Sequence, residues 1–143
     1  VIPRIGVVLH PSGGALQKML CPFKYYLGGA IGSGKQFVPW VHIDDLVEMF
    51  MFVAKNKSCE GVYNFVAPNP CTMKELAKTI GKVLHKPAVF KVPEFVLKII
   101  LGEAATMLIC SQKVLPQRLI DANFKFEFER LEDALADLLK NNE

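Results

Sequence analysis

Short apolar runs alternate along the chain with longer segments in which apolar residues recur at helical spacing. Residues 5–9 (IGVVL) form a continuous apolar run, which is typical of a strand buried on both faces of a parallel sheet. Residues 36–43 and 62–66 predict two more strands, the first with Pro39 at an edge or a bulge. Residues 89–92 predict a brief further strand. Because helical segments separate the strands, the pattern predicts an α/β fold.

Two helices are predicted in the first half of the chain. Residues 15–26 carry helix formers, and a glycine-rich loop follows them. Asp44 predicts the N-cap of a second helix. The apolar residues of this helix share one face, which we expect to pack on the core: Leu46, Val47, Phe50, Met51 and Ala54.

The second half of the chain carries clearer helix signals. Thr72 and Glu75 form a capping box that starts a third helix. Pro93 suits the first position of an apolar helix, which is expected to break at Gly102. The last helix is predicted from leucines at helical spacing: Leu131, Leu135, Leu138 and Leu139.

The composition indicates that the chain packs against more protein. Its 143 residues are 51% hydrophobic and 22% charged, which excludes a disordered tail. A chain this short has a large surface for its volume, and a polar surface ordinarily dilutes the apolar fraction. The predicted strand at residues 5–9 also has few candidate neighbours. We therefore expect the rest of its sheet to lie outside these residues.

Charge and the spacing of cysteines and histidines exclude several kinds of partner. The net charge of +3 is mild and the lysines are spread singly, which predicts a solvated surface and no nucleic-acid partner. No stretch is apolar and long enough to predict a membrane span. The four cysteines and three histidines form no close pairs, so no metal site is predicted. Reduced cysteines are typical of a cytoplasmic protein.

No self-sufficient active site is predicted, and no catalytic residue is assigned. Residues 29–36 (GAIGSGKQ) nearly spell a phosphate-binding P-loop, but Gln36 replaces the hydroxyl that holds magnesium, and a strand follows where a helix is needed. The sequence contains no glycine-rich dinucleotide fingerprint, no Tyr-x-x-x-Lys pair and no nucleophile elbow.

Two histidines are candidates for chemistry. The His42-x-Asp44-Asp45 segment allows an acid–base site, but we favour a structural reading in which Asp44 caps the helix and Asp45 interacts with its dipole. His10 follows a predicted strand, and ligands bind at the ends of parallel strands in α/β sheets.

Three stretches, taken in order, resemble a known family: residues 4–16 (RIGVVLHPSGGAL), 32–46 (GSGKQFVPWVHIDDL) and 61–68 (GVYNFVAP). Together they resemble the C-terminal half of an extended short-chain dehydrogenase/reductase of the NAD-dependent epimerase/dehydratase family. Short segments between residues 92 and 126 resemble the C-terminal domain of unknown function of one subgroup, usually labelled nucleoside-diphosphate-sugar epimerase.

The resemblance implies a fold and a division of the chain. Residues 1–87 would contain the end of a Rossmann-like sheet together with elements of the substrate-binding domain, and residues 88–143 would form the subgroup's short C-terminal helical domain. The partner would be an N-terminal dinucleotide-binding half, absent from these residues, with the glycine-rich loop and the catalytic Tyr and Lys.

The resemblance also implies site residues. Gly6, Val7 and Val8 would form a wall beside the nicotinamide of NAD or NADP. His10, together with Gln36 and Trp40, would face the cleft for a small-molecule substrate.

One departure from the family pattern bears on the substrate. Family members that process nucleotide sugars often carry an Arg that pairs with the substrate's diphosphate, and Val38 stands at that position. An apolar side chain makes no charge-assisted pair, so a smaller or less charged substrate is expected.

Two functions of different classes follow. In the first, the chain is the substrate-domain half of an NAD(P)-dependent oxidoreductase or epimerase and is inactive alone, so whether it counts as an enzyme by itself stays open. The alternative is a non-enzymatic interaction or self-association module, in which the chain folds alone or exchanges elements with a second copy as a homo-oligomer and serves as a binding surface. A weaker possibility is a small-ligand domain that uses His10 and Trp40.

Overall fold

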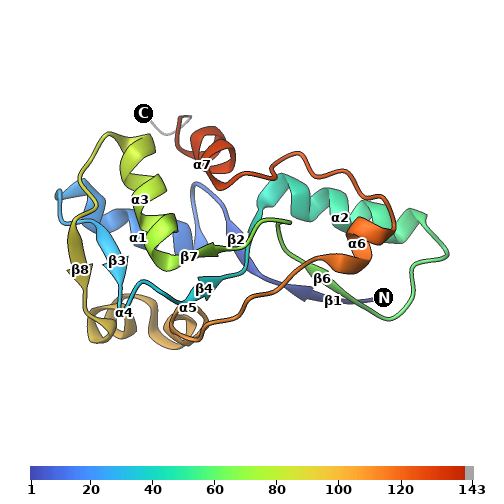
Figure 1. Ribbon diagram of the computed structural model, residues 1–143, viewed down its shortest axis with the longest axis horizontal. Coiled ribbons are helices and arrows are strands. Elements are labelled where there is room, and N and C mark those ends of the chain that lie inside the picture. The colour runs from blue at the N-terminus through green and yellow to red at the C-terminus, as the bar shows by residue number, and fades with distance from the viewer. Residues whose placement is uncertain (141–143) are drawn as a thin grey trace.

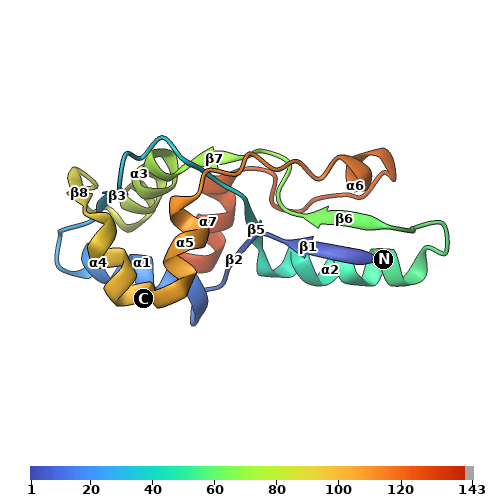
Figure 2. The same ribbon diagram turned by 90° about the horizontal axis from the view of Figure 1, so that it is seen from below.

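The computed structural model describes residues 1–140, and it describes the backbone alone for Leu97, Ile100, Leu101, Ala104, Met107 and Leu108. The molecule is elongated (Figure 1). Helices α1, α3 and α7 gather toward one end with strands β3 and β8, while α2 and α6 lie toward the other with β1 and β6. The N-terminus lies at this second end in both views (Figure 2).

The elements alternate between short strands and helices, as the sequence pattern predicts. The strands are β1 (Ile2–Ile5), β2 (Val7–Leu9), β3 (Gly29–Ile31), β4 (Phe37–Val38), β5 (Trp40–His42), β6 (Val62–Phe65), β7 (Cys71–Thr72) and β8 (Phe90–Val92). The α-helices are α1 (Gly14–Lys24), α2 (Ile43–Lys55), α3 (Met73–Leu84), α4 (Glu94–Leu101), α5 (Ala105–Ile109), α6 (Gln117–Asp121) and α7 (Leu131–Lys140), with a 3-10 turn, η1 (Gly102–Ala104), between α4 and α5.

The strands pair two by two. Strand β1 pairs in parallel with β6, β2 with β5 and β3 with β8, while β4 and β7 are antiparallel. The α/β class is therefore confirmed.

The strands predicted at residues 5–9 and 36–43 are each interrupted, the first at Gly6 and the second at Pro39. The two interruptions lie next to each other. Gly6 donates its N–H to the Phe65 carbonyl at 3.2 Å, whereas Val7 donates to the Pro39 carbonyl at 2.6 Å. The chain thus changes partner from β6 to β5 at Gly6. A side chain at Gly6 would clash with the Pro39 carbonyl, so the crossing requires glycine.

The predicted start and buried face of α2 are wrong in part. The N-cap is His42, whose ring accepts the Asp44 N–H, and Asp44 lies inside the helix. Leu46 is buried as expected, but much of the remaining face is exposed: Val47, Phe50, Met51 and Ala54.

Other local signals are confirmed, with small shifts. The Thr72–Glu75 capping box is formed in full at the start of α3. Pro93 is the N-cap of α4 and not its first helical residue, and Gly102 breaks the apolar segment as expected. Helix α6 is not anticipated by the sequence pattern.

The buried apolar residues form two clusters. We call one the larger core; it joins α1, α3, α7, β2 and β5 through Leu9, Leu16, Phe23, Trp40, Leu76, Ile80, Leu135 and Leu138, among others. We call the other the smaller core; it joins α2, β6 and α6 through Val41, Leu46, Met49, Tyr63, Phe65, Leu119 and Phe124, with Cys59.

Elements of the predicted C-terminal domain, residues 88–143, contact both ends of the molecule. Helix α7 packs against α3, and α6 packs against β6. The domain division after residue 87 stays a prediction. Within residues 1–140, no helix is long and apolar enough to cross a bilayer.

Candidate functional site

A cleft of about 350 Å³ lies where β1 and β6 end, and Gly6, the first predicted cofactor residue, lines it. The other lining residues come from β1, β6, the β4–β5 junction and an extended segment: Arg4, Ile5, Pro39, Asn64, Val66 and residues 112–115. The carboxyl ends of parallel strands are where open α/β sheets bind ligands, so this cleft is the candidate site.

Polar groups of the cleft come from facing positions of the two strands. Arg4 and Asn64 are register partners in the parallel pair. The Asn64 side-chain amide donates to the Leu115 carbonyl at 3.1 Å, which fastens the extended segment along the cleft. Arg4 makes no ion pair with any residue in 1–140, and its side chain is exposed. Sequence reasoning missed Arg4 and Asn64. Asn64 is a polar residue inside a predicted strand, which is a usable signal, whereas Arg4 lies in β1, just before the strand predicted at residues 5–9.

Val7 and Val8 follow Gly6 into β2, but neither side chain lines this cleft. Val7 is buried in the larger core, and Val8 is half-buried against the smaller core. Their predicted contact with a cofactor stays a prediction.

His10 lies at the far end of β2, in a turn. Its Nδ1 accepts the Ser12 N–H at 3.2 Å, and the Ser12 hydroxyl lies 3.3 Å from the same nitrogen. His10 is half-buried and does not line the cleft beside Gly6.

Gln36 and Trp40 are both buried, and each side chain holds backbone in place. The Gln36 Nε2 donates to the Ile31 carbonyl at 2.9 Å, which closes the glycine-rich loop. Trp40 is 1% exposed, and its indole N–H donates to the Asn69 carbonyl at 3.0 Å. The side chains of His10, Gln36 and Trp40 thus do not share one open surface within residues 1–140, and their assignment to a substrate cleft stays a prediction.

Val38, which the resemblance places where family members that process nucleotide sugars often carry an arginine, is wholly buried. It pairs with Cys71 across the β4–β7 ladder. Burial raises the pKa of the Cys71 thiol to about 12. The thiol stays protonated at neutral pH, so Cys71 is not a nucleophile.

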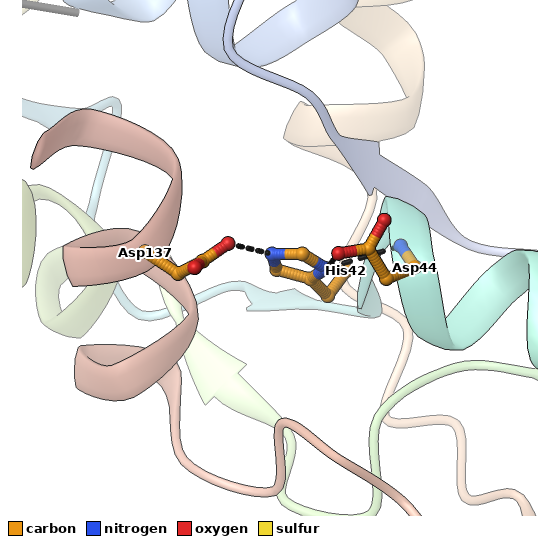
Figure 3. A group of neighbouring side chains, drawn as sticks. All are labelled: His42, Asp44 and Asp137. Carbon is orange, nitrogen blue, oxygen red and sulfur yellow. Dashed lines mark hydrogen bonds and ion pairs between the residues drawn. The ribbon is translucent and has the colours of Figure 1, made fainter. Parts of the chain in front are cut away.

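His42, Asp44 and Asp137 bring potential ligand atoms within 4.8 Å of one another (Figure 3). The Asp44 backbone N–H donates to His42 Nδ1 at 3.1 Å, which assigns the ring proton to Nε2; that nitrogen donates to Asp137 Oδ2, also at 3.1 Å. Both ring nitrogens are committed, so the group joins β5 and α2 to α7 and is not a ready cation site. Phe128 stacks on the buried ring at 3.8 Å between centroids.

Asp45 makes a second link to the C-terminal segment. Its carboxylate accepts the backbone N–H groups of Glu127 and Phe128 at 2.8 and 3.0 Å. The His42–Asp45 segment therefore has a structural role, as predicted. The prediction did not include the partners of Asp45, which lie more than eighty positions away in the sequence.

Comparisons with known proteins point to one group of relatives. Residues 92–138 match a family described as a domain of unknown function (DUF1731). An epimerase family protein of Staphylococcus aureus (strain N315) is 40% identical over 140 residues, which are 98% of this chain and 47% of the relative. An Arabidopsis thaliana chloroplastic homologue of the epimerase family protein SDR39U1 is 43% identical over 137 residues, 96% of this chain and 40% of the relative.

Among solved structures, the human epimerase family protein SDR39U1 (isoform 2) with NADPH is similar to this chain. It is 40% identical with a TM-score of 0.89, over 97% of this chain and 48% of the human one. The chain thus spans about half the length, or less, of the relatives that it matches.

Proposed function

We propose that this chain forms the substrate-facing half of an NAD(P)-dependent oxidoreductase or epimerase. It is homologous to the C-terminal half of epimerase family proteins, which belong to the extended short-chain dehydrogenase class. The observation that carries the proposal is the likeness to the human structure that holds NADPH, at 40% identity over nearly the whole of this chain. A nicotinamide dinucleotide supplies hydride transfer when it is bound.

The surface around β1 supports this proposal. Strand β1 pairs with β6 along one edge, and no strand within residues 1–140 pairs with its other edge. Ile2 is 63% exposed on that strand, and Val47, Phe50 and Met51 are exposed on the adjoining helix α2. An unpaired edge beside exposed apolar side chains is where further strands and helices of a sheet would pack.

In the proposed enzyme, this chain provides one wall of the catalytic cleft. Gly6 lines the cleft at the strand ends, and the Arg4 guanidinium supplies a positive charge from β1. We keep Val7 and Val8 as neighbours of the nicotinamide. We expect a substrate smaller or less charged than a nucleotide sugar, because Val38, at the position where an arginine would pair with a diphosphate, is apolar and buried.

The proposal keeps the remaining expectations about the chain. The proton-transferring Tyr and Lys belong to the other half, so the chain is inactive alone. All four cysteines are free, with Cys21 and Cys110 exposed, which suits the reducing cytoplasm.

A chimera tests the proposal. The N-terminal half of the human relative is fused to this chain, and NADPH binding is measured by calorimetry for the chimera, for this chain and for the N-terminal half alone. We expect the chimera to bind NADPH and this chain to give no measurable heat.

Two outcomes would overturn the proposal. One is tight NADPH binding by this chain alone. The other is a folded chimera without NADPH affinity, together with a stable homo-oligomer of this chain in light scattering; that pair of results favours the self-association module, which the exposed residues of β1 and α2 also allow.

A further inference from the structure

Five basic residues line one groove of the structure. The groove has a volume of about 590 Å³, and its lining residues come from α3, from the loop that leads into β8 and from Ala30 of β3. Its basic residues are Lys74, Lys78, Lys82, His85 and Lys86. The sequence alone predicts a dispersed, solvated set of lysines, but the fold brings these together.

The groove carries a net positive charge, because its lining includes four lysines and no acidic residue. Glu132 of α7 pairs with Lys82 at 2.8 Å, and the Lys86 ammonium lies 4.8 Å from the centre of the Tyr26 ring. Lys74 and Lys78 are exposed and make no ion pair within residues 1–140.

Helix electrostatics account for Lys82, which lies in the last turn of α3, but not for Lys74 and Lys78. Lys74, Lys78 and Lys82 follow one another at four-residue spacing, and like charges at this spacing destabilise a helix. Lys74 also lies in the first turn of α3, where the helix dipole disfavours a cation.

The backbone at the end of α3 positions the two remaining basic residues, His85 and Lys86. His85 adopts a left-handed conformation (φ 54°, ψ 39°) at a position that glycine usually occupies. The next residue, Lys86, donates its N–H to the Gly81 carbonyl at 2.9 Å. A non-glycine residue in this conformation is strained, and here the strained residue places an imidazole at the groove.

The other lining residues are apolar or small: Ala30, Gly81, Ala88 and Val89. A side chain at Gly81 would come within 2.7 Å of the Lys86 carbonyl, so glycine lets the loop approach α3 closely. We propose that this groove binds a phosphate ester, with the phosphate among the lysines and an apolar part of the ligand on this floor. The site lies apart from the cleft beside Gly6 and does not depend on the proposed function.

The three histidines of the chain serve as natural reporters. Phenyl phosphate and inorganic phosphate are titrated at constant pH and ionic strength, and the ring proton signals are followed by NMR, with His85→Gln to assign the His85 signal. We expect the His85 signal to shift and saturate, while His42 and His10, neither of which lines the groove, do not respond. Phenyl phosphate should bind about fivefold more tightly, since its ring covers the apolar floor.

Two lysine variants complete the test. Lys78→Gln should weaken phenyl phosphate binding about threefold or more, whereas Lys18→Gln, an equal change of charge on α1 outside the groove, should leave it unchanged. Equal effects of the two variants, a linear response of all three histidines or no response at His85 would each overturn the proposal. If the chain aggregates at NMR concentration, the same titrations are made on the chimera with the dinucleotide half.

Discussion

The two cores of the molecule differ in how completely they are covered. In the larger core, α3 is closed on one side by the sheet and on another by α7, and residues such as Leu76 and Leu135 are wholly buried. In the smaller core, α2 buries Leu46 and Met49, while Val47, Phe50 and Met51 of the same helix stay exposed.

This difference shows which part of the fold the chain completes by itself. The larger core draws residues from both ends of the sequence, and the residues of this cluster are buried within residues 1–140. Apolar side chains around it also stay exposed, among them Leu27, Val89 and Phe95. The exposed residues of α2 lie beside the smaller core, where the proposed partner half would pack. We infer that the larger core holds most of the stability of the isolated chain, and that the apolar surface of α2 contributes only when a partner covers it.

Matched methionine substitutions give the largest expected contrast between the two regions. Met73 in α3 is 0% exposed in the larger core, and Met51 in α2 is 46% exposed. Met73→Ala should lower the free energy of unfolding by about 3 kcal/mol, because it leaves a cavity. Met51→Ala should lower it by less than about 0.5 kcal/mol.

Urea unfolding followed by circular dichroism measures both changes. The comparison sharpens in the chimera with the dinucleotide half, where Met51→Ala should become more costly as that half covers α2. Equal destabilisation by the two substitutions in the isolated chain would contradict the assignment of its stability to the larger core.

The exposed side of α2 also illustrates what the sequence could and could not predict. The Thr72–Glu75 capping box is a reliable local signal, because it needs only residues three positions apart, and it forms as predicted. The Asp44 cap is also a local signal but is wrong, since His42 caps α2. An apolar pattern, in contrast, shows that a face will be buried but not by what. Leu46 is covered by this chain, and Met51 is not.

Long-range partners explain most of the remaining errors. Nothing near Asp45 in the sequence indicates that its carboxylate accepts N–H groups from residues 127 and 128. The place of Gln36 and Trp40 in a substrate cleft stays a prediction, and the sequence does not indicate that their side chains donate to the Ile31 and Asn69 carbonyls. The four-residue spacing of Lys74, Lys78 and Lys82 is a local signal that sequence reasoning did not use, whereas the approach of Ala30 to the groove is long-range.

The next largest effect concerns the attachment of the C-terminal segment to the smaller core. Asp45 is buried and accepts two backbone N–H groups, so Asp45→Asn replaces one acceptor by a donor that faces an N–H. We expect a loss of about 2 kcal/mol in the free energy of unfolding.

Asp44→Asn is the matched control. The Asp44 side chain is 62% exposed, and its backbone N–H, which the substitution keeps, makes the bond to His42. Its effect should stay within about 0.5 kcal/mol. Chemical denaturation measures the free energy of unfolding of both variants. A larger loss for Asp44→Asn than for Asp45→Asn would contradict the assignment of the anchoring role to Asp45.

The smallest effect concerns the ion pair that joins α7 to α3 across the edge of the larger core. The Lys82 ammonium donates to Glu132, and this bond, with the charge of Lys82, lowers the pKa of the Glu132 carboxyl. A carboxyl with a lower pKa in the folded state stabilises that state above its unfolded pKa, about 4.3, and the contribution disappears as pH falls through the lowered value. Glu132→Gln should therefore reduce the melting temperature slightly at neutral pH and flatten its decline in acid. Because both groups are exposed, added salt should shrink the difference.

Glu129→Gln is the matched control. Glu129 is a nearby exposed carboxyl without an ion pair inside residues 1–140, so this substitution should leave the decline of the melting temperature in acid unchanged. If both variants flatten the decline alike, the acid sensitivity arises from the total charge of the chain and not from the contact between α3 and α7.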